Sequence, residues 1–219
     1  MVRRFRRRRM EDFDRTFRLR PDLRVLDAGG TSLNWSLVTT MPRLVVLSLP
    51  RRREETGAGV TLVFADGRAM PFRDRAFDIV FSNSVIEHLG DAESQRRFAA
   101  EVARVGRGYW VQTPNRWFPV EPHLLTPFLH WLPRSWRGAV ARRFTVWEWL
   151  ARPRPDQREY YVRHCAEEVR LLGPRELGAL FPGAAVRKER LLGLTKSLVA
   201  VKVWSGHGAR VHMSVDSAR

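Results

Sequence analysis

The chain has 219 residues, of which 44% are hydrophobic and 11% aromatic, so it can bury a core and is not a disordered protein. This length suits one sizeable α/β domain and is short for two. The net charge of +16 at pH 7 comes almost wholly from arginine. It favours an anionic partner, whether nucleic acid, an acidic membrane surface or a phosphorylated substrate, unless the arginines only form a solvated surface.

The start of the chain is basic, but acids follow where an export signal would have its apolar segment. The single cysteine, Cys165, excludes an internal disulfide and a multi-cysteine metal cluster. No later run is apolar enough to span a bilayer. We therefore expect a cytoplasmic protein whose residues 1–20 form a basic arm. Peripheral contact of this arm with an anionic membrane is an expected companion role.

Five short apolar strands and at least one helix are expected in the first half of the chain. Leu33 begins a short helix, and Asp91 is a good N-cap for a helix over residues 92–105. Strands apolar on both faces that alternate with helices indicate a parallel sheet covered by helices, which makes the fold class α/β. The expected strands are residues 24–28, 43–49, 60–67, 78–83 and 109–113.

The second half of the chain carries an expected insertion at about residues 114–155, where prolines and tryptophans interleave with arginines. Residues 136–150 place four apolar side chains on one face of a helix. This segment is expected to be a lid over an acceptor, with an interfacial helix and ordinary core packing as alternatives. Strands near residues 184–190 and 197–204 then form an antiparallel hairpin that closes a single domain over residues 21–204. Residues 205–219 are expected to be a tail.

The segment RVLDAGG ends a strand with an acid and paired glycines, which are costly in regular structure unless a group must approach the backbone. A dinucleotide fingerprint would need glycines where Thr31 and Asn34 stand, and a phosphate-binding P-loop would need a Gly-Lys-Ser/Thr that is missing. An acid at Asp27 suits a cationic ligand better than a pyrophosphate.

Three spaced motifs, VLDAGGTS, FADGRAMPFRDRAFDIVFSNSVIEHL and VARVGRGYWVQTPN, resemble those of class I S-adenosylmethionine-dependent methyltransferases, in particular the methyltransferase type 11-like family. The resemblance covers roughly residues 24–113. It implies a Rossmann-like, seven-stranded, mostly parallel sheet with an antiparallel terminal hairpin and helices on both faces. It also implies S-adenosyl-L-methionine as the cofactor.

The resemblance implies a role for each motif at the cofactor. The methionine end would be held by Asp27 and the turn that follows it, and the adenine amino group would donate to Asp66. A serine, Ser48, stands where the family usually has the acid that clasps the ribose, and it binds a hydroxyl more weakly than a carboxylate does. The other implied cofactor residues are Gly29, Gly30 and Thr31 in the turn, Gly67 and Arg68 beside adenine, and Asn83 and Ser84 beneath the sulfonium.

Two pairs of an acid and an imidazole follow the expected fourth and fifth strands, Glu87 with His88 and Glu121 with His123. Either pair could orient and deprotonate a hydroxyl acceptor, or could serve only to cap a helix and satisfy a buried group. No metal site is expected from the two pairs, because they lie far apart in sequence and lack a signature spacing.

The expected function is methyl transfer from S-adenosylmethionine to a small-molecule, lipid-linked or glycan-like acceptor, at oxygen rather than nitrogen. Nucleic acid is a less favoured substrate, because an Asn/Asp-Pro-Pro-aromatic signature is missing from the sequence. Two alternatives stay open. The chain could be a non-catalytic binding protein that keeps the fold, or a basic module that associates with a membrane or with nucleic acid through its arginine-rich arm.

Overall fold

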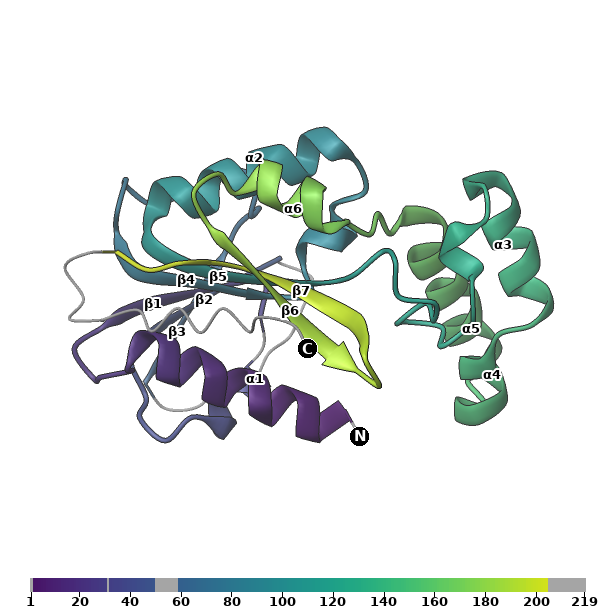
Figure 1. The fold of residues 1–219 in the computed structure, drawn as a ribbon, viewed down its shortest axis with the longest axis horizontal. Coiled ribbons are helices and arrows are strands. Elements are labelled where there is room, and N and C mark those ends of the chain that lie inside the picture. The colour runs from purple at the N-terminus through teal and green to yellow at the C-terminus, as the bar shows by residue number, and fades with distance from the viewer. Residues whose placement is uncertain (1, 31, 50–58, 205–219) are drawn as a thin grey trace.

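A seven-stranded sheet forms the centre of the computed structural model, which describes residues 2–30, 32–49 and 59–204 (Figure 1). The strand order is β3-β2-β1-β4-β5-β7-β6. The first five strands run parallel, and β7 is antiparallel to both of its neighbours. The expected α/β fold class is confirmed. The strands are β1 (Arg24–Ala28), β2 (Arg43–Ser48), β3 (Val60–Phe64), β4 (Phe77–Asn83), β5 (Gly106–Pro114), β6 (Ala185–Leu191) and β7 (Leu194–Lys202).

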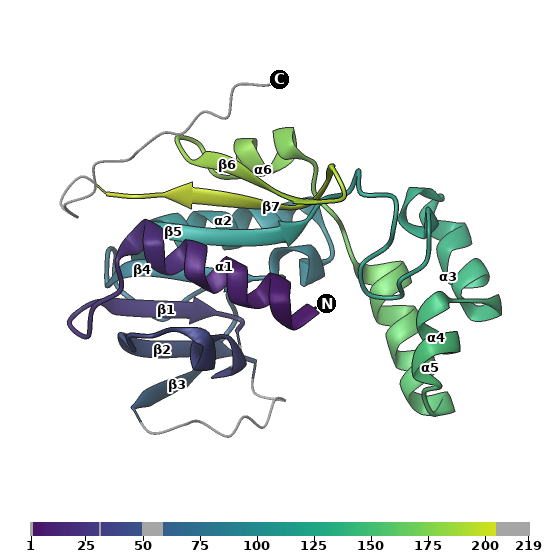
Figure 2. The same cartoon turned by 60° about the horizontal axis from the view of Figure 1, so that its bottom comes forward.

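Helices cover both faces of this sheet, as Figures 1 and 2 show. Helices α2 (Ala92–Val105) and α6 (Pro174–Leu180) lie on one face and pack on a core that includes Phe98 and Leu177. The helix expected after Asp91 is confirmed, with the Asp91 carboxylate accepting a hydrogen bond from the Ser94 amide at 2.7 Å. A short 3-10 helix, η1 (Ser32–Leu37), replaces the helix expected from Leu33.

The other face of the sheet is covered by helix α1 (Val2–Phe17), which occupies most of the expected basic arm. Met10, Phe13 and Phe17 are buried there, and the Phe13 ring contacts those of Trp35 and Phe81. These three residues recur at helical spacing and form an apolar stripe, which the arginines around them obscured. Most of the segment expected as a basic arm is therefore a helix packed on the sheet. The expected tail, residues 205–219, lies outside the described residues.

The insertion forms a helical lobe, with a small core of its own, beyond the end of β5 (Figure 1). The expected single helix over residues 136–150 is wrong. The first helix ends at Arg143, and Thr145 caps the next one by accepting a hydrogen bond from the Glu148 amide. The lobe also extends past residue 155. Its elements are α3 (Arg134–Arg143), α4 (Val146–Ala151), α5 (Pro155–Tyr161) and a π-helical segment, η4 (Val162–Glu168).

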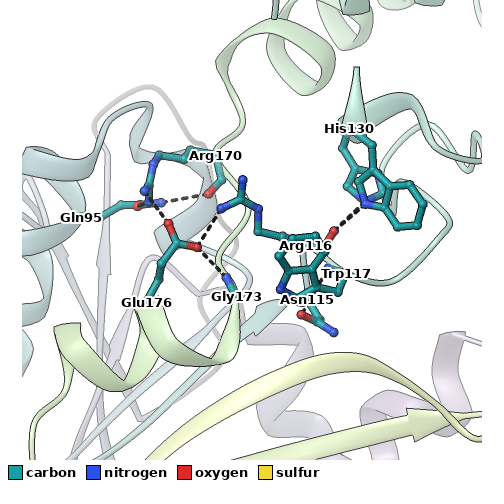
Figure 3. Close-up of polar contacts among 9 residues, drawn as sticks. Gln95, Asn115, Arg116, Trp117, His130, Arg170, Gly173 and Glu176 are labelled. Carbon is teal, nitrogen blue, oxygen red and sulfur yellow. Dashed lines mark hydrogen bonds and ion pairs between the residues drawn. The ribbon is translucent and has the colours of Figure 1, made fainter. Parts of the chain in front are cut away.

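A network of arginines and one glutamate joins the lobe to the sheet (Figure 3). The Glu176 carboxylate accepts hydrogen bonds from Arg116 at 3.1 Å, from Arg170 at 2.7 Å and from the Gly173 amide at 2.9 Å. Arg116 lies where the chain leaves β5, and Arg170 lies where it returns. The Trp131 indole donates to the Arg116 carbonyl at 2.8 Å. These contacts fix both ends of the lobe beside the carboxyl end of β5.

A candidate active site at the carboxyl edge of the sheet

Four neighbouring parallel strands, β3, β2, β1 and β4, carry polar side chains at or just beyond their carboxyl ends. Asp27 lies near the end of β1, Ser48 ends β2, Asp66 follows β3 and Asn83 ends β4. Ligands of open α/β sheets bind beyond this edge, where the connecting loops diverge. The structure thus places the two predicted cofactor acids, Asp27 and Asp66, at one edge of the sheet, with β2 between their strands.

The turn after β1 is packed closely around the Asp27 carboxylate, which is fully buried. The Trp35 indole donates a hydrogen bond to this carboxylate at 2.7 Å. A Cβ atom on Gly30 would collide with the same carboxylate, and one on Gly29 would lie 2.7 Å from the Val85 side chain. Gly29 also has a φ of +81°, which favours glycine. Internal packing alone therefore requires both glycines, whereas the sequence suggested that a ligand does. Thr31, the next predicted cofactor residue, lies outside the described residues.

Asp66 is held at the other end of this edge by Arg68. The Arg68 amide donates to one carboxylate oxygen at 2.8 Å, and the guanidinium contacts the other at 2.7 Å. This hydrogen bonding from Arg68 holds the pKa of Asp66 below its usual value, so the group is an ionised acceptor at neutral pH. Its side chain is 41% exposed. A Cβ atom on Gly67 would meet the Phe98 ring at 3.0 Å, so Gly67 also has a packing role.

Between these two acids, β2 ends at Ser48, which is buried and whose carbonyl accepts a hydrogen bond from the Ala65 amide at 3.0 Å. The edge therefore has a buried carboxylate at one end, an exposed carboxylate at the other and a buried hydroxyl-bearing residue between them. The exposed carboxylate of Asp66 can accept a hydrogen bond from an amino group of a nucleoside. The central serine supplies the weakest contact of the three, since charged acceptors form the stronger hydrogen bonds.

An arginine that the sequence did not single out lies beside the predicted residues Asn83 and Ser84. Arg9 of helix α1 donates to the Asn83 side-chain oxygen and, at 3.0 Å, to the Gln112 side-chain oxygen. The Ser84 hydroxyl donates to that same Gln112 oxygen at 3.0 Å. Arg9 is also paired with Glu189 at 2.5 Å. No local pattern predicts these contacts, because the partners come from four separate parts of the chain.

The two predicted pairs of an acid and an imidazole form one cluster. Glu87 and His88 lie on a short 3-10 helix, η2 (Ile86–Leu89), directly after β4, and the other pair lies in the loop that follows β5. The Nε2 atoms of His88 and His123 are 3.2 Å apart. The Nδ1 atom of His123 lies 2.8 Å from the Glu121 carboxylate. The fold thus joins residues that are more than thirty positions apart in the sequence.

Burial and charge set the protonation of this cluster. Glu87 is fully buried, and burial raises its pKa even though the Thr113 hydroxyl donates to it at 3.0 Å. Burial and the neighbouring His123 lower the pKa of His88 to about 3, so His88 is neutral at ordinary pH. Burial would lower the pKa of His123 too, but hydrogen bonding to Glu121 and the negative charges of Glu121 and Glu87 outweigh it and raise that pKa.

The helical lobe covers this cluster with a third imidazole. The ring of His164, from η4, stacks on the ring of His88 with their centroids 5.5 Å apart, and its Nδ1 atom contacts the Glu168 carboxylate at 2.5 Å. A small pocket lies nearby, lined in part by Glu121 and the buried Cys165. No sequence pattern predicts the contact between His164 and His88, because it depends on how the lobe packs against the domain.

Comparison with known proteins agrees with this architecture. A family model described as "Methyltransferase domain" matches residues 38–108. Among solved structures, a Rhodobacter sphaeroides protein titled a putative Zn-dependent alcohol dehydrogenase is 14% identical, with 89% of this chain and 87% of that chain covered and a TM-score of 0.57. No curated protein matches the chain.

Two further solved structures are similar to the chain to different extents. The 1,6-didemethyltoxoflavin-N1-methyltransferase of Burkholderia thailandensis, solved with S-adenosylhomocysteine, is 15% identical, with 90% and 78% of the two chains covered and a TM-score of 0.54. The match to the [4+2]-cyclase SpnF is 17% identical with a TM-score of 0.41, and it covers 50% of this chain and only 45% of that one. The two matches with TM-scores above 0.5, at 14% and 15% identity, show a shared fold alone.

Proposed function

We propose that the chain is a class I S-adenosylmethionine-dependent methyltransferase that methylates a hydroxyl oxygen of a small-molecule, lipid-linked or glycan-like acceptor. The methyltransferase family model over residues 38–108 supports the first part of this proposal. The observation that carries this proposal is the convergence of Glu87, His88, Glu121 and His123 in one cluster. Glu87 and His88 of this cluster follow the same strand, β4, as Asn83 and Ser84, which we assign to the methyl group's surroundings. A hydroxyl is a poor nucleophile until its proton leaves, and a carboxylate-supported imidazole can take that proton.

The cofactor side of the proposal depends on the edge between Asp66 and Asp27. S-adenosylmethionine supplies a methyl group that its sulfonium already activates. In our proposal Asp66, with the backbone of Gly67 and Arg68, binds the adenine, and Ser48 binds the ribose. Asp27, with the turn after it, orients the methionine ammonium. The chain's own task is then to align the acceptor oxygen with the methyl group and to exclude water.

On the acceptor side, Glu121 orients His123. A carboxylate only accepts hydrogen bonds, so the proton between the two groups resides on Nδ1 of His123 when the ring is neutral. The Nε2 lone pair of His123 is then left facing the cluster, where it can accept the hydroxyl proton. The helical lobe supplies His164 above His88 and is well placed to keep water away from the acceptor, as a lid would.

The test is to measure formation of S-adenosylhomocysteine with matched hydroxyl and amine acceptors, together with S-adenosylmethionine binding by calorimetry. We expect turnover with hydroxyl acceptors, and we expect His123→Gln to lower kcat by about 10²–10⁴-fold, as loss of a general base does, while cofactor binding is kept. His130→Gln, which changes a histidine outside the cluster, is the control. No binding at millimolar cofactor would instead favour a non-catalytic binding protein, and turnover of amines that is indifferent to His123→Gln would contradict O-methylation.

We also propose that the lobe contacts an anionic membrane surface, which suits a lipid-linked acceptor. The carrying observation is the exposure of three aromatic side chains: Trp136 is 64%, Phe144 58% and Trp149 72% exposed. Three arginines lie between Trp136 and Phe144 in the sequence, and aromatic residues beside cations favour the interface of an acidic bilayer. In the part of the chain that the structure describes, no helix is long and apolar enough to cross a bilayer.

Vesicle sedimentation tests this contact. Binding to vesicles with anionic phospholipid, weakened by salt and by the double change Trp136→Ser and Trp149→Ser, is the expected result. Leu192→Ser, which changes an apolar side chain that is 92% exposed on the β6–β7 turn, is the matched control and should leave binding unchanged. Equal retention by neutral and anionic vesicles, or retention only by nucleic acid, would contradict the proposal.

A further inference from the structure

The cluster formed by the segments after β4 and β5 contains three groups that metals prefer as ligands. One atom each from Glu87, His88 and His123 lies within 4.8 Å of the other two. The two imidazole Nε2 atoms are 3.2 Å apart. Two nitrogens bound to one tetrahedral zinc ion at its usual bond length lie about 3.3 Å apart. The spacing in the structure is therefore close to that of neighbouring ligands of a single ion.

A second observation comes from Glu87, which is fully buried. One of its carboxylate oxygens accepts the hydrogen bond from Thr113, and the other, Oε1, has no hydrogen-bond partner among the described residues. A buried carboxylate oxygen without a partner is costly. A bound cation would compensate this charge and complete the contacts of the carboxylate, so the cluster is better satisfied with a metal than without one.

The surroundings of the two histidines also suit a metal. Glu121 is buried and contacts Nδ1 of His123 at 2.8 Å, and its other oxygen accepts a hydrogen bond from the His123 amide at 2.9 Å. A carboxylate behind a histidine is the usual arrangement around metal ligands, because it fixes the ring and turns the free nitrogen toward the ion. His88 is held by stacking between the lobe and the domain.

We propose that Glu87, His88 and His123 bind one divalent cation of the zinc type, with Glu121 as the residue that orients His123. Two imidazoles and one carboxylate favour zinc over magnesium or calcium, which prefer oxygen ligands. Three protein ligands leave a further coordination position for water or for an acceptor oxygen. The inference goes beyond the proposed O-methylation and does not depend on it. With an ion bound, the Nε2 atom of His123 would be a ligand rather than the base, and the ion would instead lower the pKa of an acceptor hydroxyl at the open position.

Metal titration of the whole chain, freed of metal with a chelator, tests the proposal. Zinc is added alone in a competition assay with a coloured chelator, and cobalt is added separately so that its absorption reports the geometry. We expect one tightly bound ion per chain and intense visible absorption from tetrahedral cobalt. His88→Ala and His123→Ala should each weaken zinc binding by more than about 100-fold, and Glu121→Gln by about 10–100-fold, as loss of an outer partner does.

His130→Ala is the matched control and should bind zinc as the unaltered chain does. Because an alanine at a buried position could unfold the protein, Glu87→Gln and thermal unfolding with and without zinc are measured as well. Zinc should raise the Tm of the unaltered chain and not that of Glu87→Gln. No stoichiometric binding, or binding that survives in both His88→Ala and His123→Ala, would overturn the metal site. Calorimetry with S-adenosylmethionine on the same samples separates this result from failure of the proposed methyl transfer.

Discussion

The two halves of the carboxyl edge are built in different ways. On the cofactor half, the two predicted acids lie at or just after the end of their own strands, and their side-chain contacts are local: Asp27 with Trp35 and Asp66 with Arg68. On the acceptor half, the contacts that matter join distant segments, as with His88 and His123, or His164 and His88.

This difference shows which residues of a site can be assigned from the sequence and which cannot. A turn that follows a strand is placed by that strand alone, so its residues can be assigned from their order in the chain. A cluster made by an insertion depends on where the insertion folds back. The contacts of Glu176 with Arg116 and Arg170 (Figure 3) fix that position here, and neither arginine carries a motif.

The largest expected effect tests whether packing within the cofactor half fixes its glycine turn. Gly29→Ala combines a φ of +81° with a contact of 2.7 Å to Val85, so we expect the free energy of unfolding to fall by about 2–5 kcal/mol from strain and overpacking together. Gly90→Ala is the matched control, with the same φ but nothing within 4 Å of its Cβ, and it should cost only about 1–2 kcal/mol. Equal losses in urea unfolding would show that packing against Val85 is unimportant.

A second substitution tests cofactor binding by the same half of the carboxyl edge. Asp27→Asn keeps the shape of the side chain and removes its charge, so S-adenosylmethionine binding should weaken by about 10–100-fold, the usual value of a hydrogen bond to a charged group. Trp35→Phe removes the indole donor while the acid remains, and it should weaken cofactor binding less. Calorimetry of S-adenosylmethionine binding to both variants tests this prediction. A larger loss in Trp35→Phe would mean that Asp27 acts only through the packing of the turn.

The third change loosens the junction of the acceptor half. Glu176→Gln replaces the carboxylate that Arg116 and Arg170 share, and we expect it to lower the free energy of unfolding by about 1–2 kcal/mol. Cofactor affinity should be unchanged, and the KM for the acceptor should rise because the lobe is less firmly placed. Steady-state kinetics beside calorimetry test this. A change in cofactor affinity of the same size would show that the two halves are coupled.

The smallest expected effect concerns pH at Asp66. Its folded pKa is lowered by Arg68, so the pair stabilises the fold above the ordinary carboxyl pKa, and this stability is lost as pH falls through the folded pKa. The side chains are about two-fifths exposed, and solvent screening limits the contribution to about 0–1 kcal/mol. Asp66→Asn should therefore be slightly less stable than the unaltered chain at pH 7, and this difference should shrink as pH falls below the ordinary carboxyl pKa of about 3.9. A difference that grows on acidification would contradict this.

Several expectations about the fold followed from local pattern and are confirmed. The Asp91 cap, the helix after it and the antiparallel hairpin at the end of the sheet are examples. The expectations that were wrong concern amphipathic segments. The arginine-rich start of the chain hid the stripe of Met10, Phe13 and Phe17, and the single helix expected over residues 136–150 breaks where Phe144 becomes extended.

By itself, the sequence determined the order of the strands along the chain and the identity of the polar groups that end them, because each strand and turn is specified by neighbouring residues. Only the tertiary structure decided that Glu87, His88, Glu121 and His123 meet, and that Arg9 reaches Asn83. The physical reason is that burial and charge act through space. The pKa of a histidine and the groups that it contacts depend on its neighbours in space, and only the folded structure shows which residues these are.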